Sequence, residues 1–212
     1  DLDEGALHKI VINNPSVWSQ KTHVDRPDLA IGILVDESGS MRGYKENQSR
    51  DVAIILTEAL KDLKGVDLAV MGHTGILDSY IFDGLQDEAK HVPLGSSTDN
   101  YDQLVMREFY NNREYRNPYA LVHTKGIYEN LDGYAMEAAS KRLRQLFPKA
   151  KSYVLIHISD GAPCPTSISH TRKSVEKCVH ELGVQVFAIG VCNAYRPETG
   201  EKLYGPNRNI VI

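Results

Sequence analysis

A short run of the chain, residues 31–40, joins a buried-strand pattern to a cluster of oxygen-bearing side chains. It reads IGILVDESGS, apolar as far as Val35, with Asp36, Ser38 and Ser40 then at alternate positions. An uninterrupted apolar run predicts a strand covered on both faces, and open α/β sheets bind ligands at the carboxyl ends of such strands. One carboxylate beside two hydroxyls suits a hard cation such as Mg²⁺ or Ca²⁺. The run therefore predicts a parallel strand that ends in a candidate metal site.

A helix N-cap is the alternative interpretation of this motif, because Asp and Ser both cap helices well. A second motif favours the metal. Ser159, Asp160 and Gly161 directly follow another apolar run, residues 153–158. Two parallel strands that each end in an Asp bring their carboxylates to one rim, and a glycine lets the chain turn away sharply. Taken alone, Asp160 and Gly161 could also form an ordinary turn.

A third ligand is expected from the loop before the helix that leads into residues 153–158. Asn130 and Asp132 lie in that loop. Asp132 can be an N-cap, a metal ligand, or both through a water molecule. Thr98 is a second candidate for this role, although its loop does not lead into the same strand.

Helical and strand patterns alternate along the rest of the chain. Apolar residues recur at helical spacing in three segments, 52–63, 131–146 and 175–182. Further strands are expected at 66–71, 80–82, 184–191 and 209–212. The alternation predicts an α/β fold with a doubly wound, mostly parallel central sheet flanked by helices. Residues 84–128, rich in Asn, Tyr and Arg, are expected to form an irregular excursion over the carboxyl edge of the sheet.

Composition narrows the class of protein. The chain has 212 residues, of which 42% are hydrophobic and 25% charged. This length and composition are enough for one α/β domain with a buried core. A formal net charge of −4 implies no general attraction to nucleic acid or to an anionic membrane. With no apolar span and no basic-then-apolar start, we expect a cytoplasmic protein, and Asp1 in place of Met indicates trimming from a longer one.

Cysteine and histidine do not suggest a soft-metal site. Cys164, Cys178 and Cys192 are widely spaced, with no C-x-x-C pair, which indicates a reducing compartment. We interpret Cys178 and Cys192 as small core residues. The eight histidines, among them His73 and His157, are scattered along the chain and are interpreted as core or surface residues.

Taken in order, the strand with D-x-S-x-S, the loop before the second helix and the strand ending in Ser-Asp-Gly resemble a von Willebrand factor type A (VWA) domain over about residues 28–212. The resemblance implies a metal-ion-dependent adhesion site, in which Mg²⁺, or another divalent cation such as Ca²⁺ or Mn²⁺, is held partly through water. It assigns the metal to five residues: Asp36, Ser38, Ser40, Asp132 and Asp160.

Three longer segments narrow the resemblance. VDESGSMRG at 35–43, ENLDGYA at 129–135 and ISDGAP at 158–163 are similar to the VWA subunit of the aerobic, ATP-dependent cobaltochelatase. Residues 1–27 are then a lead-in from a preceding region, and 84–128 a long insertion. Tyr134, and the residues after Pro163, stand where that subunit has acidic side chains, so partner contacts are expected to differ.

The resemblance implies a non-catalytic module that couples an AAA+ ATPase to a large chelatase subunit or client, as in cobalt insertion for cobalamin biosynthesis. The partner would dock through a carboxylate at the metal. Residues 204–207 also resemble VWA domains that act with a MoxR-type AAA+ ATPase in nitric-oxide-reductase activation. A Mg²⁺-dependent phosphohydrolase with Asp36 as nucleophile is the enzymatic alternative, but Ser38 stands where it would need a second carboxylate.

Overall fold

One seven-stranded sheet organises the molecule. The computed structural model describes residues 28–76, 89–91, 103–113, 121, 126, 130–161, 168–192 and 195–212. The strands are β1 (Leu29–Asp36), β2 (Val66–Ile76), β3 (Ala89–His91), β4 (Gln103–Asn111), β5 (Ser152–Ser159), β6 (Val184–Gly190) and β7 (Asn209–Val211). The helices are the 3₁₀ turn η2 (Gly39–Met41), α2 (Tyr44–Leu60), α3 (Asp132–Leu146), α4 (Ile168–His180) and α5 (Pro197–Tyr204).

The sheet is mostly parallel, as expected, and β1 lies at its centre. The strand order is β3-β4-β2-β1-β5-β6-β7. β1 pairs in parallel with β2 on one side and with β5 on the other, whereas β4 runs antiparallel to both β2 and β3. The predicted α/β, doubly wound class is therefore confirmed.

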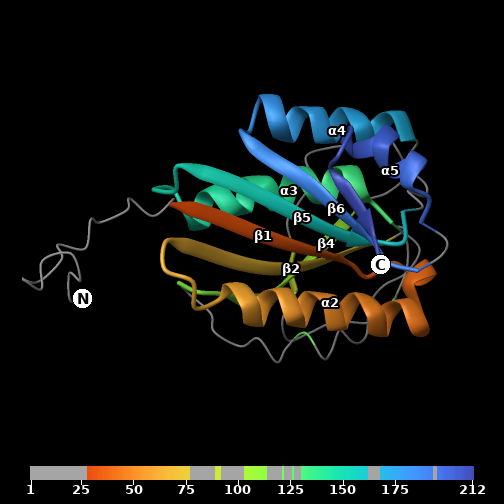
Figure 1. Cartoon of the computed structure of the whole chain (residues 1–212), viewed down its shortest axis with the longest axis horizontal. Coiled ribbons are helices and arrows are strands. Elements are labelled where there is room, and N and C mark those ends of the chain that lie inside the picture. The colour runs from red at the N-terminus through yellow and green to blue at the C-terminus, as the bar shows by residue number, and fades with distance from the viewer. Residues whose placement is uncertain are drawn as a thin grey trace, which may run out of the picture.

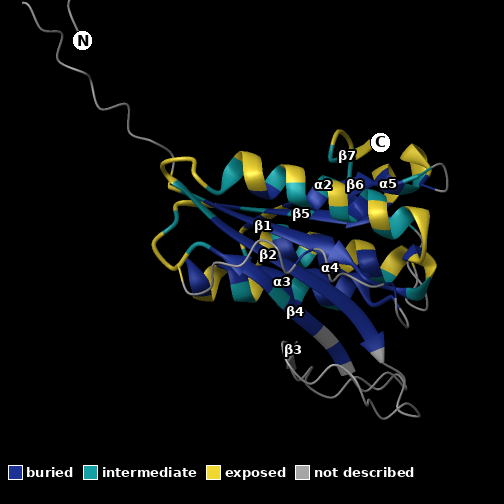
Figure 2. Ribbon diagram, turned by 90° about the horizontal axis from the view of Figure 1, so that it is seen from below, coloured by how far each residue is buried: buried dark blue, intermediate teal, exposed yellow. Residues whose placement is uncertain are grey.

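Alternation along β1 divides the core between two faces of the sheet (Figure 1). Ile31, Ile33 and Val35 pack with Ala53 of α2. Leu34 packs on the other face, in a cluster to which α3, α4 and α5 all contribute. Because both faces are covered, β1 and most of β2 are buried, while the helices are exposed on their outer sides (Figure 2).

The apolar stripe predicted for α2 is confirmed only in part. Val52, Leu56 and Leu60 pack against the core but are only partly buried. Ser49, Ala53 and Thr57, four residues apart, are the residues of this helix that lie buried against the sheet. The Thr57 hydroxyl donates to the Ala53 carbonyl oxygen at 2.6 Å, which satisfies its polar atom. Ile55 and Leu63, placed in the stripe from the sequence, are 66% and 50% exposed. Small side chains on the inner face let the helix approach the sheet closely.

Part of the segment expected to be irregular belongs to the sheet. β3 and β4 both lie within residues 84–128, and β4 supplies Leu104, Phe109 and Tyr110 to the buried interior. The prediction of an excursion over the edge is wrong for these strands. Whether the segment is an insertion stays a prediction, and the expected strand at 80–82 lies outside the described residues.

The topology marks one place on the sheet edge for a ligand. From β1 the chain passes through α2 to β2, on one side of β1, and later returns through α3 to β5, on the other side. The strand order thus changes direction at β1. In doubly wound folds the loops separate at such a point and leave a crevice at the carboxyl ends of the strands. Asp36 ends β1 at this crevice.

Two properties of the remaining chain bear on its chemistry. Cys178 of α4 is fully buried, and burial raises the pKa of its thiol to about 11, so it is a core residue as expected. Cys192 is half-buried, and Cys164 lies outside the described residues. No helix in the described ranges is long and apolar enough to cross a membrane.

A buried ion pair fastens β4 to the loop after β1. Arg107 of β4 donates to the Glu37 carboxylate at 2.7 Å, and the two side chains are 10% and 2% exposed. The guanidinium also lies 4.9 Å from the ring centre of Phe109. Glu37 is the residue between Asp36 and Ser38, so this pair fixes the loop that carries the candidate site.

We predict that Arg107→Met destabilises the fold by about 3 to 5 kcal/mol, because it removes the cation facing a buried carboxylate. Arg172→Met is the matched control. Its partner Glu176 is 3.0 Å away, but both side chains are more than half exposed, so the expected change is within about 0.5 kcal/mol. Urea unfolding of both variants measures the difference. Equal free energies of unfolding would show that the buried pair has no special role.

Candidate metal centre

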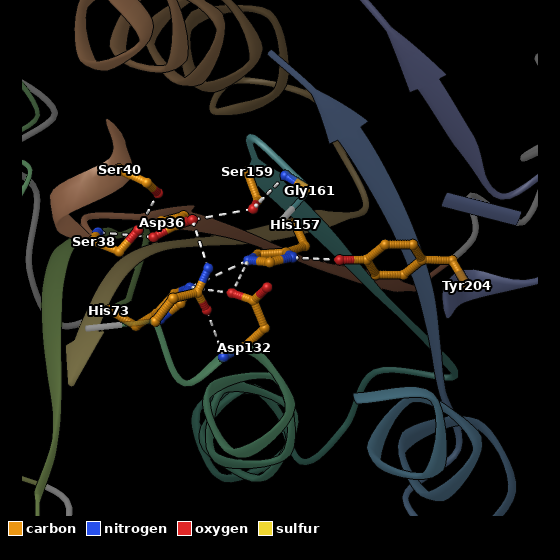
Figure 3. A network of polar contacts seen from close by, with 10 residues as sticks. Asp36, Ser38, Ser40, His73, Asp132, His157, Ser159, Gly161 and Tyr204 are labelled. Atoms are coloured by element: carbon orange, nitrogen blue, oxygen red, sulfur yellow. Dashed lines mark hydrogen bonds and ion pairs between the residues drawn. The ribbon is translucent and has the colours of Figure 1, made fainter. Parts of the chain in front are cut away.

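Three loops meet at the carboxyl end of β1. The first follows β1, the second precedes α3 and the third follows β5 (Figure 3). They carry the oxygen-bearing residues that the sequence singled out. Asp36 is the last residue of β1, and Asp160 directly follows β5. Both carboxylates are buried, so each needs hydrogen-bond or charged partners.

Asp36 is held by donors from the loop after β1, the loop before α3 and the end of β5. Its Oδ1 accepts the Ser38 backbone N–H at 2.8 Å. Its Oδ2 accepts from the Ser159 hydroxyl at 3.0 Å and from the Asn130 amide at 3.2 Å. Asp36 is only 2% exposed, so these donors replace the water that its carboxylate has lost.

The two serine hydroxyls of the motif lie side by side. Ser38 Oγ and Ser40 Oγ are 3.1 Å apart. Ser38 is buried, whereas Ser40 is exposed at the rim. The 3₁₀ turn η2 begins directly after Ser38, and Ser38 makes no side-chain cap to it. The serine oxygens are therefore arranged with each other and not as helix caps.

Asn130 is a positioning residue in this arrangement. Its amide oxygen accepts the Asp132 backbone N–H at 3.0 Å, while its amide nitrogen donates to Asp36. One side chain thus connects the start of α3 to the end of β1. Thr98, the other candidate for this loop position, lies outside the described residues.

Negative charge accumulates at the site. Asp36, Asp132 and Asp160 are each 2% exposed or less. Burial, followed by the nearby charges of Asp36 and Asp160, raises the pKa of Asp132 well above its usual value. Burial also raises the pKa of Asp36, although the Ser38 hydrogen bonds oppose the shift. Neighbouring buried carboxyl groups oppose one another's ionisation. A cation bound between them would stabilise their ionised forms.

Lys45, in the first turn of α2, already supplies one positive charge. Its ammonium lies 2.7 Å from Asp160 Oδ2. Hydrogen bonding to Asp160 raises the pKa of Lys45. No pattern in the sequence places this lysine at the site, because the contact joins residues 115 positions apart.

Gly161 turns the chain after Asp160, as the sequence predicted. Its φ is +78°, and a side chain there would also meet the ring of Tyr195. The Gly161 N–H donates to Ser159 Oγ at 3.1 Å, which leaves the hydroxyl hydrogen of Ser159 for Asp36.

The structure therefore brings the predicted residues to one edge of the sheet. The donor set of hydroxyls and carboxylates fits a hard divalent cation, and buried carboxylates outnumber the lysine beside them. Direct ligation by any of the five residues stays a prediction. What the sequence missed is the pair His73 and His157, which are fully buried and whose Nε2 atoms lie 3.5 Å from Asp132 Oδ1.

A family comparison agrees with this geometry. The model of the family described as the cobalamin biosynthesis protein CobT VWA domain matches residues 17–194. The chain belongs to this family. The resemblance drawn from the three sequence motifs is thereby confirmed.

Solved structures show the same fold for this CobT-family VWA domain. A von Willebrand factor type A protein from Catenulispora acidiphila superposes with a TM-score of 0.60 at 14% identity, over 87% of this chain and 38% of that one. The manganese-loaded TRAP protein of Plasmodium vivax has a TM-score of 0.56 at 14% identity, over 87% and 68%. The SpRpn10 VWA domain has a TM-score of 0.53 at 12% identity, over 86% of both chains. This chain thus spans less than half of the first of these proteins.

We predict that Lys45→Met strengthens Mg²⁺ binding roughly tenfold, because a positive charge no longer competes with the cation for Asp160. In chelator the same variant should lose about 1 to 2 kcal/mol of stability, since a buried carboxylate loses a charged hydrogen bond. Titration calorimetry and urea unfolding measure the two effects.

Lys61→Met is the control. Lys61 pairs with Glu58 at 2.7 Å at the far end of α2, away from the site. It should change neither quantity appreciably. Unchanged or weaker Mg²⁺ binding by Lys45→Met would contradict the assignment of Asp160 to the cation site.

Proposed function

We propose that this domain is a Mg²⁺-dependent docking module of a cobaltochelatase-type subunit, which couples an AAA+ ATPase to its client for cobalt insertion. The proposal rests on the position of the Asp36 carboxylate. Donors from two loops and from the end of β5 fix it beside the paired hydroxyls of Ser38 and Ser40. Membership of the CobT family supports cobalt insertion over activation of a nitric-oxide reductase.

The ligand set favours docking through the metal. Two neutral hydroxyls and carboxylates held partly through water leave a coordination position free for a carboxylate from another protein. Ser40 is exposed, so the cation would face outward on that side. A partner's Asp or Glu would complete the sphere, and binding would depend on the cation.

The hydrogen bonds of Asp36 argue against the phosphohydrolase alternative. An attacking carboxylate needs a free oxygen aimed at the substrate. Both oxygens of Asp36 accept hydrogen bonds from within the domain, and the side chain is buried. We therefore propose that the domain is non-catalytic on its own and that chemistry occurs in its partners.

We propose that the domain acts in the cytoplasm and has no nucleic-acid or membrane partner. The buried free thiol of Cys178 is compatible with a reducing compartment. The net charge of −4 offers no general attraction to anionic surfaces.

We predict that Ser40→Ala weakens binding to the AAA+ ATPase and large chelatase subunit of the same genome by at least about tenfold in Mg²⁺, because it removes one hydroxyl from the metal site. Surface plasmon resonance in Mg²⁺ and in chelator measures the effect. Because Ser40 is exposed, the variant should fold normally.

Ser152→Ala is the control, since this exposed serine begins β5 at the opposite edge of the sheet. It should bind as the unaltered protein does. Partner binding that persists in chelator, or that Ser40→Ala leaves intact, would refute docking through the metal.

A further inference from the structure

A second cluster of ligand-type side chains lies beneath the rim. His73 comes from β2 and His157 from β5, the two strands that flank β1, and Asp132 comes from the first turn of α3. All three are at most 1% exposed. Figure 3 shows both imidazoles and the carboxylate directed toward one another, below Asp36.

Their spacing matches the edges of a metal tetrahedron. The two Nε2 atoms are 3.2 Å apart, and Asp132 Oδ1 is 3.5 Å from each of them. A tetrahedral ion with bonds of about 2.0 to 2.1 Å needs ligand atoms about 3.3 to 3.4 Å apart. The triangle can therefore hold such an ion without rearrangement of the strands.

The buried polar atoms call for a cation. Neither carboxylate oxygen of Asp132 has a hydrogen-bond partner among the described residues, although both are inaccessible to water. Both imidazoles face Asp132 Oδ1 through Nε2, a ring nitrogen that can ligate a metal. A neutral imidazole is the form that ligates a metal.

An outer contact of His157 points its Nε2 atom inward, toward Asp132. The Nδ1 atom of His157 lies 2.8 Å from the hydroxyl of Tyr204, at the end of α5, which fixes the orientation of the ring. The Nδ1 atom of His73 has no hydrogen-bond partner in the described chain, and its polar contacts run through Nε2. An outer hydrogen bond like the one between His157 Nδ1 and Tyr204 is usual for metal-binding histidines.

We propose that His73 Nε2, His157 Nε2 and Asp132 Oδ1 bind a buried divalent transition-metal ion of the zinc class, and that Asp132 ligates this ion in place of the hard cation at the rim. Two imidazoles and one carboxylate are ligands of Zn²⁺ and of neighbouring first-row ions, whereas Mg²⁺ prefers oxygen ligands alone. The ion joins β2, β5 and α3 beneath the Asp36 loop. It thereby anchors the floor of the docking site.

The test measures Zn²⁺ and Co²⁺ binding by the chain after exhaustive dialysis against chelator, with Mg²⁺ in excess to fill the rim site. We expect one equivalent of Zn²⁺ by elemental analysis and the visible absorption of tetrahedral Co²⁺. His73→Phe and His157→Val should each weaken Zn²⁺ binding at least about hundredfold. Circular dichroism checks that each variant stays folded, because His157→Val leaves the buried Tyr204 hydroxyl without its partner and His73→Phe leaves His157 Nε2 without one.

Three further variants distinguish binding at the buried histidines from non-specific binding by a surface histidine and from binding at the rim. Tyr204→Phe keeps the three ligands and should weaken Zn²⁺ binding by about ten- to a hundredfold at unchanged stoichiometry. His180→Gln removes an exposed histidine and should have no effect. Ser40→Ala disables the rim site alone and should also leave the Zn²⁺ equivalent intact, so failure of the docking proposal and failure of this one are distinguishable.

The proposal is overturned by any of three results. The first is no stoichiometric uptake of Zn²⁺ by the unaltered protein, which would leave a hydrogen-bonded pair of neutral histidines. The second is Zn²⁺ binding that survives both histidine substitutions. The third is loss of the Zn²⁺ equivalent in Ser40→Ala, which would place the ion at the rim.

Discussion

The buried carboxylate of Asp36 is the contact on which the rest of the site depends. It closes the central strand of the sheet, and its three hydrogen-bond donors come from two loops and the end of β5. A carboxylate without such donors would be too costly to bury, so the loops must come together around it. The positions of Ser38, Asn130 and Ser159 therefore follow from the need to satisfy one side chain.

The same arrangement creates an excess of negative charge that the chain only partly offsets. Lys45 neutralises Asp160 from the solvent side. The histidines beneath Asp132 remain neutral because they are buried. We therefore expect bound cations to stabilise the domain, because each cation would pair with a carboxylate that burial has left without a compensating charge.

The sequence predicted what depends on patterns along one strand. The apolar runs before Asp36 and Asp160 identify β1 and β5, and parallel pairing then places both carboxylates on one edge. β4 escaped prediction because its alternation is interrupted. A bulge beside Val70 and Met71 leaves Phe109 and Tyr110 both buried, although they are neighbours in sequence. The stripe predicted for α2 was only partly right, since its most deeply buried residues, Ser49, Ala53 and Thr57, are small or polar and carry little apolar signal.

His73 and His157 were beyond sequence reasoning for a geometric reason. They are 84 residues apart and stand on strands that do not pair with each other. Strands two positions apart lie about 9.5 Å from each other, so two histidines meet only by leaning over the strand between them. The register allows this, because His73 stands opposite Asp36 and His157 opposite Leu34 on β1. Asp132 is the first residue of α3, at the positive end of the helix dipole, and its Oδ1 lies 3.5 Å from the Nε2 atom of each ring. The two imidazoles therefore meet across the strand that carries Asp36.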